Sequence, residues 1–463
     1  MRKFAFLCFV VSLIGTGVGL LSLNACGGIK NGAGGGIPPG KLQHVVVIFQ
    51  ENRTPDNLFH DPVLMARGAD IASSGINSQG QNIQLTPTSL GIGYDLSHAH
   101  SAFTAMYDGG KMDGADQIPI RCYVTNCPPP NPQFMYVQAS DVGPYFQMAE
   151  QYTFGDRMFQ TNEGPSFPAH QFIISGTSAP SASSNLFVAE NMSAGNPGCT
   201  APSFSLVMLI DPKGNESSSM YPCFEHATLT DELDANNLSW RYYAANLVSI
   251  WTAPDAIQHI CQPQTQNGQL VCTGKAWSNV IIPPTTVLTD IANNQLAAVT
   301  WVTPSSPYSD HPGGTLATQG PSWVASIVNA IGNSPYWGNT AILVTWDDWG
   351  GWYDHVPPSK VINDGTSWGS GYVYGFRVPL IVISPYAKPA YVSHVTHDFG
   401  SILNFIEGVF GLSSLGYADA RADNLSDCFN FSQPPLQFQT ISSPLGKDFF
   451  VHDTRPMEDP DTD

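Results

Sequence analysis

The sequence is poor in charged residues, and above all in positively charged ones. Only 12% of its 463 residues are charged, and 18 Lys and Arg stand against 37 Asp and Glu, which gives a formal net charge of −19. A nucleic-acid-binding protein needs a basic surface to displace the counterions of the phosphates, so this balance argues against a nucleic-acid partner. The low total charge also argues against a disordered acidic chain, and the 42% of hydrophobic residues can form a large core.

Long hydrophobic runs are equally scarce. Only Phe4–Leu23 has the length to span a bilayer, and it follows the basic start Met1-Arg2-Lys3. The run ends in Leu23-Asn24-Ala25-Cys26, which resembles a bacterial lipobox. We therefore expect residues 1–26 to be a secretion signal with a lipidated Cys26, and the alternative is an uncleaved N-terminal anchor.

This leader predicts where the protein works and how the rest of the chain is arranged. Residues 27–41 are rich in Gly and Pro and are expected to form a tether, and residues 456–463 form an acidic tail. We expect an extracytoplasmic protein that is periplasmic, membrane-tethered or secreted. Any contact with the membrane is expected through the N-terminal anchor only.

Nine cysteines fit that location. Cys8 and Cys26 belong to the leader, Cys428 stands alone, and the remaining six form pairs that are close in sequence: Cys122/Cys127, Cys199/Cys223 and Cys261/Cys272. A zinc site at the first pair is disfavoured because no second Cys/His pair lies nearby. Outside the cytoplasm such pairs are typical of disulfides that hold long loops, although spacing alone leaves their connectivity open.

Short, continuous apolar runs predict the fold. Runs of this length favour strands that are buried on both faces of a parallel sheet, and they occur at residues 44–49, 298–302, 341–346 and 379–384. Residues 322–331 and 401–410 have apolar residues at helical spacing. We predict an α/β protein with a mostly parallel central sheet and helices on both faces, and no internal repeat.

Acidic and imidazole groups follow three of these strands. Glu51-Asn52 follows the first, Asp310-His311 comes after the second, and Asp347-Asp348 ends the third. Ligands of open α/β sheets bind beyond the carboxyl ends of the strands. Adjacent carboxylates would repel each other there unless a cation neutralised them, so the pattern predicts a divalent metal site.

Ser166 is the predicted nucleophile. It stands in the Gly- and Pro-framed segment Gly164-Pro165-Ser166, ahead of a predicted apolar turn at Phe172-Ile173-Ile174. No Gly-x-Ser-x-Gly segment stands in the surroundings of a nucleophile elbow, so a triad hydrolase has little support. Activation of the serine by a metal is the simpler interpretation.

Several motifs together resemble the phosphoesterase family of bacterial phospholipases C and acid phosphatases, over about residues 42–431. The most specific is Trp346–Pro358, and the others are Gln50–Arg53, His98, Asp108–Asp113, Gly164–Ser166, Ser309–Pro312, Arg377–Pro385, His397–Leu403 and Phe405–Glu407. The resemblance implies a catalytic domain over residues 42–455 with an alkaline-phosphatase-like three-layer sandwich fold.

The resemblance also implies a role for each matching residue. Glu51, Asn52, Asp347, Asp348 and Ser166 would bind the metal, and Ser166 would attack phosphorus to give a phosphoseryl intermediate. Histidines around the phosphoryl group would neutralise its oxygens or protonate the leaving group, and the matching residues are His98, His311 and, more loosely, His259. His355 lies in the most specific motif, but we expect it to hold the loop rather than to contact substrate.

The substrate is expected to be a small phosphoester or a phospholipid. Family phospholipases often have threonine at the position of Ser166 and a Pro-Asn-Arg run where this chain has Pro168-Ala169-His170. Many also have C-terminal β domains, so we expect an acid-phosphatase-type phosphomonoesterase first and a phospholipase C second. A non-catalytic surface binding protein is a remote alternative. A sulfatase is disfavoured because its Cys/Ser-x-Pro-x-Arg segment is not found.

Overall fold

The computed structural model describes residues 36–313, 319–359 and 374–458. The predicted secretion signal, the lipobox and most of the tether therefore lie outside the described residues, as does most of the acidic tail. Residues from Gly36 onward form one compact unit. Among the described helices, none combines the length and the apolar character needed to cross a membrane.

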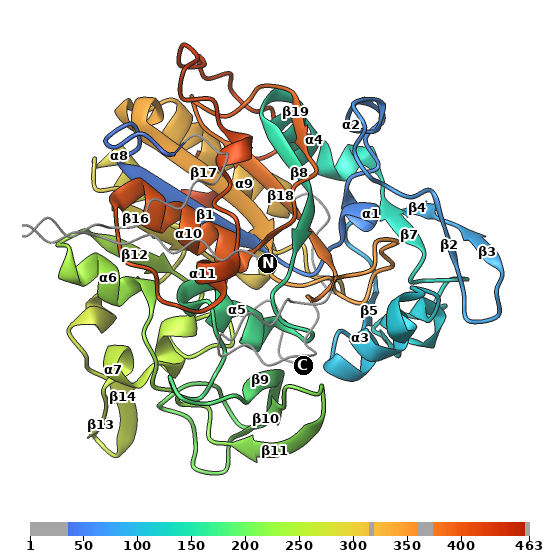
Figure 1. Ribbon diagram of the computed structural model, residues 1–463, viewed down its shortest axis with the longest axis horizontal. Helices are drawn as coiled ribbons and strands as arrows, with labels where there is room; N and C mark the ends of the chain where they lie inside the picture. Colours follow the sequence, from blue (N-terminus) through green and yellow to red (C-terminus); the bar gives the residue numbers. More distant parts are fainter. Residues whose placement is uncertain (1–35, 314–318, 360–373, 459–463) are drawn as a thin grey trace, which may run out of the picture. The chain divides into compact units, whose positions relative to one another are not determined.

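A large sheet forms the centre of this unit (Figure 1). Its strand order is β15-β12-β16-β1-β17-β18-β8-β19, with β20 also paired to β8. The strands are β15 (Val280–Ile281), β12 (Trp240–Tyr243), β16 (Val299–Val302), β1 (His44–Gln50), β17 (Thr340–Trp346), β18 (Arg377–Ile383), β8 (Thr153–Phe159), β19 (Tyr391–Ser393) and β20 (His397–Asp398).

All pairings in this sheet are parallel except those of β18, which runs antiparallel to both β17 and β8. The mostly parallel α/β fold is therefore confirmed, and so are the four apolar runs as strands. The parallel direction expected for the run at 379–384 is wrong. An apolar run reports burial on both faces and carries no information on strand direction.

Helices cover both faces of the sheet. In the parallel β1–β17 pair, Gln50 lies beside Trp346 and Phe49 beside Thr345, so these two couples face opposite sides. Trp346 packs edge-on against Tyr145 of α4 (Ala139–Gln151), and Phe49 packs against His170 of α5 (Ser166–Ser175). The two helices therefore lie on opposite faces, as predicted.

Each of these helices belongs to a layer. α9 (Gln319–Gly332) packs against α4, and α8 (Thr286–Ala292) and α12 (Lys447–His452) pack against α9. α6 (Leu229–Ala235) and α10 (Phe399–Phe410) pack against α5, and α11 (Ala418–Arg421) packs against α10. The predicted helices at 322–331 and 401–410 correspond to α9 and α10. The latter begins earlier because Asp398 and Ser401 form a reciprocal capping box at its start.

The remaining elements surround the carboxyl ends of the strands or extend from the sheet edge. The short helices are α1 (Pro55–Leu58), α2 (Pro62–Ala66), α3 (His100–Tyr107) and α7 (Gln258–Cys261). The outer strands are β2 (Ser74–Ile76), β3 (Asn82–Gln84), β4 (Thr86–Thr88), β5 (Tyr94–Leu96), β6 (Ile120–Cys122), β7 (Met135–Val137), β9 (Phe187–Ala194), β10 (Leu206–Ile210), β11 (Glu216–Met220), β13 (Pro263–Gln266) and β14 (Gln269–Cys272).

Disulfides hold these outer segments. The three sequence-adjacent pairs are bonded as expected, with Cα–Cα distances of 5.8 Å for Cys122–Cys127, 4.5 Å for Cys199–Cys223 and 4.4 Å for Cys261–Cys272. Among the described cysteines, Cys428 is the one with a free thiol, and it is buried. The disulfides lie outside the central sheet, in loops, short outer strands and the short helix α7.

Candidate active site

The first part of the site forms where β1 and β17 end side by side. The strands continue their pairing past their last residues, because Asp347 N donates to Gln50 O at 3.0 Å and Arg53 N donates to Asp348 O at 3.0 Å. Asn52 N also donates to Asp347 Oδ1 at 3.2 Å. The pairs Glu51-Asn52 and Asp347-Asp348 are thereby brought together, and all four side chains are fully buried.

The backbone segments that follow β1 and β17 pass very close to each other at this part of the site. Asn52 has a φ of 59°, in the left-handed region that few non-glycine residues adopt. Gly350, also at positive φ, packs so closely that a Cβ there would lie 2.3 Å from Asn52 O. The glycine after Asp347-Asp348 is therefore required for the two strand ends to meet.

Ser166 reaches the same part of the site from the opposite direction. It is the first residue of α5, and its hydroxyl donates to Asp348 Oδ2 at 2.9 Å. Gly164 allows this approach, since a Cβ there would lie 2.0 Å from Ala189 O. The predicted apolar turn at 172–174 belongs to α5 instead. All ten residues of this helix are buried, so it lacks the alternation of apolar and polar faces that would have marked it as a helix.

His170 is a site residue that sequence reasoning missed. It lies one helical turn after Ser166 and is fully buried, with Nε2 3.7 Å from Asp347 Oδ2. Its Nδ1 is 3.3 Å from the hydroxyl of Tyr242, which itself donates to Trp251 O at 2.6 Å. Because the Tyr242 hydroxyl gives its only proton to Trp251 O, it accepts a hydrogen bond from His170 Nδ1. The proton of His170 is therefore on Nδ1, and the lone pair of Nε2 faces Asp347.

These residues fit a divalent cation. Glu51, His170 and Asp347 each offer a ligand atom, and the three atoms lie within 4.8 Å of one another. In the described part of the chain, Asp347 Oδ2, His170 Nε2 and Asn52 Oδ1 are buried and make no hydrogen bond. Buried oxygen and imidazole donors without such partners are what a metal ion satisfies. The predicted set of Glu51, Asn52, Asp347, Asp348 and Ser166 is thus assembled in one place, with His170 added to it.

Several carboxyl groups are buried together where β1 and β17 end. Burial and the charge of Asp347 raise the pKa of Asp348 to about 7, against the opposing effects of His98 and of hydrogen bonds from Gly350 and Ser166. A site that holds several carboxylates away from water favours the arrival of positive charge.

Two of the three histidines expected around the phosphoryl group lie beside the cluster of potential metal ligands. The rings of His98 and His311 are 5.9 Å apart, and both residues are almost fully buried. His98 Nδ1 donates to Leu96 O at 3.0 Å, and its Nε2 lies 3.4 Å from Asn52 Nδ2. His311 Nδ1 donates to Pro312 O at 2.6 Å. Both rings are therefore held in one orientation by backbone carbonyls.

His259 is placed elsewhere. It lies on α7 with 30% of its side chain exposed, and it pairs with Glu225 at 2.8 Å and Asp231 at 3.0 Å. No contact found among the described residues links it to Ser166 or to the strand ends. The match that pointed to it was the loosest of the three histidines.

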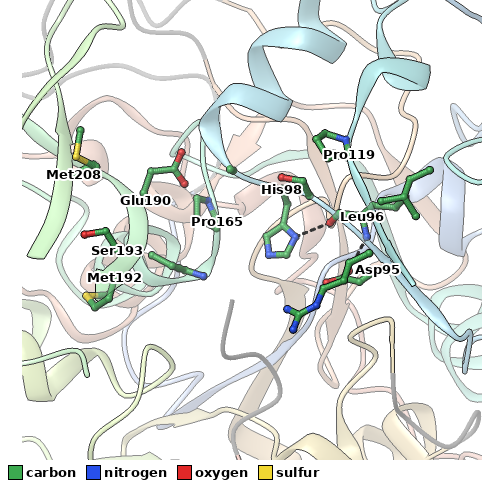
Figure 2. Close-up of a pocket in the computed structure, with 14 residues that line it drawn as sticks. Asp95, Leu96, His98, Pro119, Pro165, Glu190, Met192, Ser193 and Met208 are labelled. Carbon is green, nitrogen blue, oxygen red and sulfur yellow. Dashed lines mark hydrogen bonds between the residues drawn. The ribbon is translucent and has the colours of Figure 1, made fainter. Parts of the chain in front are cut away.

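A cavity opens beside Pro165, the residue that precedes Ser166 (Figure 2). It has a volume of about 470 Å³, and His98, Pro165, Glu190, Met192 and Met208 are among its lining residues. Burial and the charge of Glu216 raise the pKa of Glu190 to about 7. The cavity therefore offers a substrate apolar side chains together with two acidic residues, Asp95 and Glu190, and one basic residue, Arg121.

The rest of the Trp346–Pro358 motif holds the loop in place. His355 bonds to Asp56 at 2.7 Å and to Asp70 at 3.0 Å, while Arg377 pairs with Asp354 at 2.9 Å. Trp349 and Trp352 are fully buried in a second apolar cluster. These contacts agree with a positioning role for His355.

Comparison with known proteins defines a class of protein: a hydrolase that acts on phosphoester bonds. The chain belongs to the Phosphoesterase family, whose sequence profile matches residues 42–413. The family resemblance stated from the motifs is therefore confirmed.

Among its relatives are two bacterial phospholipases. Phospholipase C A of Mycobacterium tuberculosis is 24% identical over 490 residues, which cover 94% of this chain and 87% of the relative. Hemolytic phospholipase C of Pseudomonas aeruginosa is 26% identical over 427 residues, which cover 80% of this chain and 53% of the relative. A solved structure of a protein in the alkaline phosphatase superfamily from Vibrio parahaemolyticus aligns with a TM-score of 0.35 and 10% identity, over 84% of this chain and 72% of that one.

Proposed function

We propose that the protein is a phospholipase C that uses Ser166 as its nucleophile. The observation that carries this proposal is the bond from Ser166 to Asp348 at the start of a buried helix, beside the Glu51, His170 and Asp347 group. The names of the relatives favour phospholipase C over the phosphomonoesterase that the sequence motifs placed first. The residue differences at Ser166 and His170 thus carry less weight than the similarity along the whole chain.

The chain's own residues account for the reaction as follows. Ser166 Oγ attacks phosphorus, the bond from phosphorus to the diacylglycerol oxygen breaks, and the headgroup phosphate stays on the serine. The hydroxyl proton leaves along the bond to Asp348, and His98 or His311 gives a proton to the leaving oxygen. Water then attacks phosphorus and gives one proton to the histidine that had lost its own, the bond from phosphorus to Ser166 Oγ breaks, the phosphorylated headgroup leaves, and the proton held by Asp348 returns to Ser166. The N-terminus of α5 favours the phosphoryl charge throughout.

A divalent cation held by Glu51, Asn52, Asp347, Asp348 and Ser166, with His170, supplies positive charge that stabilises the serine alkoxide and the phosphoryl oxygens when bound. The identity of that cation is left open by the donor set, because carboxylate, amide and imidazole ligands suit several divalent metals. His259 has no part in this mechanism because its contacts are to Glu225 and Asp231.

We also propose that the protein works outside the cytoplasm. The three disulfides support this location, since such bonds persist in oxidising compartments. Lipidation at Cys26 and cleavage of a signal remain predictions for residues outside the described part of the chain.

Replacement of the nucleophile tests the mechanism. Ser166→Ala should lower kcat/KM on phosphatidylcholine vesicles by about 1,000-fold or more, because the phosphoseryl intermediate can no longer form. The matched control is Ser326→Ala, since Ser326 is a buried helical serine whose hydroxyl bonds to Ser322 O, away from the site. Circular dichroism of both variants reports folding.

The products decide between the two substrate classes. A phospholipase C releases diacylglycerol and a phosphorylated headgroup from the vesicles. If wild-type protein instead hydrolyses p-nitrophenyl phosphate and leaves phosphatidylcholine intact, the protein is a phosphomonoesterase. If Ser166→Ala retains wild-type turnover on either substrate, the nucleophile assignment is wrong.

A further inference from the structure

A second cluster of metal-type ligands lies at the edge of the sheet where β19 and β20 pair with β8. It consists of His397 in β20 together with Asp427 and Cys428 in the 3-10 turn η7 (Ser426–Cys428). Each residue offers a ligand atom, and the three atoms lie within 4.8 Å of one another. His397 and Cys428 are fully buried, whereas the side chain of Asp427 is 22% exposed. None of these residues belongs to the Ser166 site.

The spacing within the cluster matches the coordination of zinc. His397 Nε2 lies 3.6 Å from Asp427 Oδ1, and Cys428 Sγ lies 3.6 Å from the same oxygen. Zinc–ligand bond lengths in a tetrahedron give edges of about 3.4 Å for N···O and about 3.6 Å for S···O. Without an ion, Cys428 Sγ donates a hydrogen bond to Asp427 Oδ1, and a protonated His397 forms an ion pair with this oxygen at a distance too long for a hydrogen bond.

The histidine is oriented as a metal ligand is. His397 Nδ1 donates to Asp423 Oδ1 at 2.7 Å, so in the neutral form that binds a metal ion the lone pair is on Nε2. Ser393 Oγ lies 3.2 Å from Nε2, but its one proton goes to Asp427 Oδ2 in a short hydrogen bond. Ser393 therefore has no proton for Nε2, and a carboxylate–histidine pair points at the centre of the cluster.

We propose that His397 Nε2, Asp427 Oδ1 and Cys428 Sγ bind a structural Zn²⁺ ion, with Ser393 Oγ as the fourth ligand. A thiolate beside an imidazole favours zinc over magnesium or calcium, which take oxygen ligands. Binding replaces the thiol proton of Cys428, which is released to solvent, and the charges of the thiolate and Asp427 balance the ion. The exposed side of Asp427 provides the route of entry.

The site lies where three short segments meet at the edge of β8, which already bonds to one of them through Thr153 Oγ1 and Cys428 O at 3.1 Å. β19 and β20 have three and two residues, and η7 has three. Zinc would fix all of them to the edge of β8, the strand that leads to Ser166. The role is structural, and the inference is independent of the proposed phospholipase activity.

Cobalt substitution of the full-length protein tests the site. Cobalt bound to Cys428 should produce a thiolate-to-metal charge-transfer band, which the Ser166 site cannot produce because it contains no cysteine. Cys428→Ser should abolish the band and remove one zinc equivalent per chain from the zinc-loaded protein. Asp347→Ala is the matched control, since it should keep the band and lose metal only from the Ser166 site.

Two further variants keep the test decisive if Cys428→Ser folds poorly. His397→Gln should abolish the band in the same way. Asp423→Asn, which changes only the partner of His397 Nδ1, should weaken zinc binding in competition with a chelator by about 10- to 100-fold. The proposal is overturned if wild-type protein shows no thiolate band and its zinc content is the same in Cys428→Ser. The cluster would then be a hydrogen-bonded one with a protonated His397 between Asp423 and Asp427.

Discussion

At the scale of single residues, His170 shows how one side chain completes the site. It is buried between Asp347 and Tyr242, and its ring also packs edge-on against Trp251 at 4.9 Å. Its orientation is therefore fixed before any ligand arrives, which lowers the cost of binding a metal ion.

We expect His170→Gln to lower both the metal affinity of the Ser166 site and the catalytic rate, each by at least about 10-fold, because a preoriented ligand is lost. Competition with a chelator and kinetics on phosphatidylcholine measure the two effects. The control is His394→Gln, since the side chain of His394 is 53% exposed and pairs with Asp156. Unchanged metal affinity in His170→Gln would remove this residue from the ligand set.

The candidate site was predictable wherever a side chain follows a recognisable strand. Asp347-Asp348 and Glu51-Asn52 were found because apolar runs precede them and the carboxyl ends of parallel strands meet. His170 was not found because its place depends on α5, whose residues are buried on every side. The signal that existed was the spacing of Ser166 and His170, one helical turn apart.

At the scale of elements, the loop after β17 is joined to α1 and β18 by a buried network of charges. Burial alone would lower the pKa of His355, but the hydrogen bond and charge of Asp56, together with the charge of Asp354, raise it to about 9. A pKa above the ordinary value of about 6.5 means that protonated His355 stabilises the folded state.

This stabilisation depends on pH with a defined sign. It is complete below about pH 6.5, declines as the pH rises and is lost above about pH 9, and its full size is up to about 3 kcal/mol. The difference in unfolding free energy between wild type and His355→Gln should therefore be largest near pH 6 and smallest above pH 9. Urea denaturation at several pH values measures it, with the exposed His452→Gln as control. A difference that does not vary with pH would contradict the charge network.

Element by element, prediction from the sequence succeeded where burial dominates and failed where polar residues interrupt a strand. β1 and β17 are continuous apolar runs in the middle of the sheet. β8 pairs just as extensively, but it contains Asp156 and Arg157, which bond to the backbone and side chain of Asp70. Such polar contacts come from distant segments, so no local pattern revealed β8 as a strand.

At the scale of the whole molecule, the net charge of the protein affects its approach to the membrane that contains its proposed substrate. A protein with a net charge of −19 is repelled by a surface of anionic lipids but not by a zwitterionic one. This repulsion acts over the Debye length, which is about 10 Å at 0.1 M salt and about 3 Å at 1 M. The effect therefore concerns the approach to the membrane and not the chemistry at Ser166.

We therefore expect hydrolysis of phosphatidylcholine vesicles to slow several-fold when phosphatidylglycerol is added at low salt, and to recover as the salt concentration rises toward 1 M. The initial rate of headgroup release at constant phosphatidylcholine concentration measures this dependence. A soluble phosphocholine ester serves as control, because its hydrolysis requires no approach to a charged surface and should vary little with salt. If anionic lipid instead accelerates the reaction, a local basic surface governs membrane contact and the net charge of the chain does not.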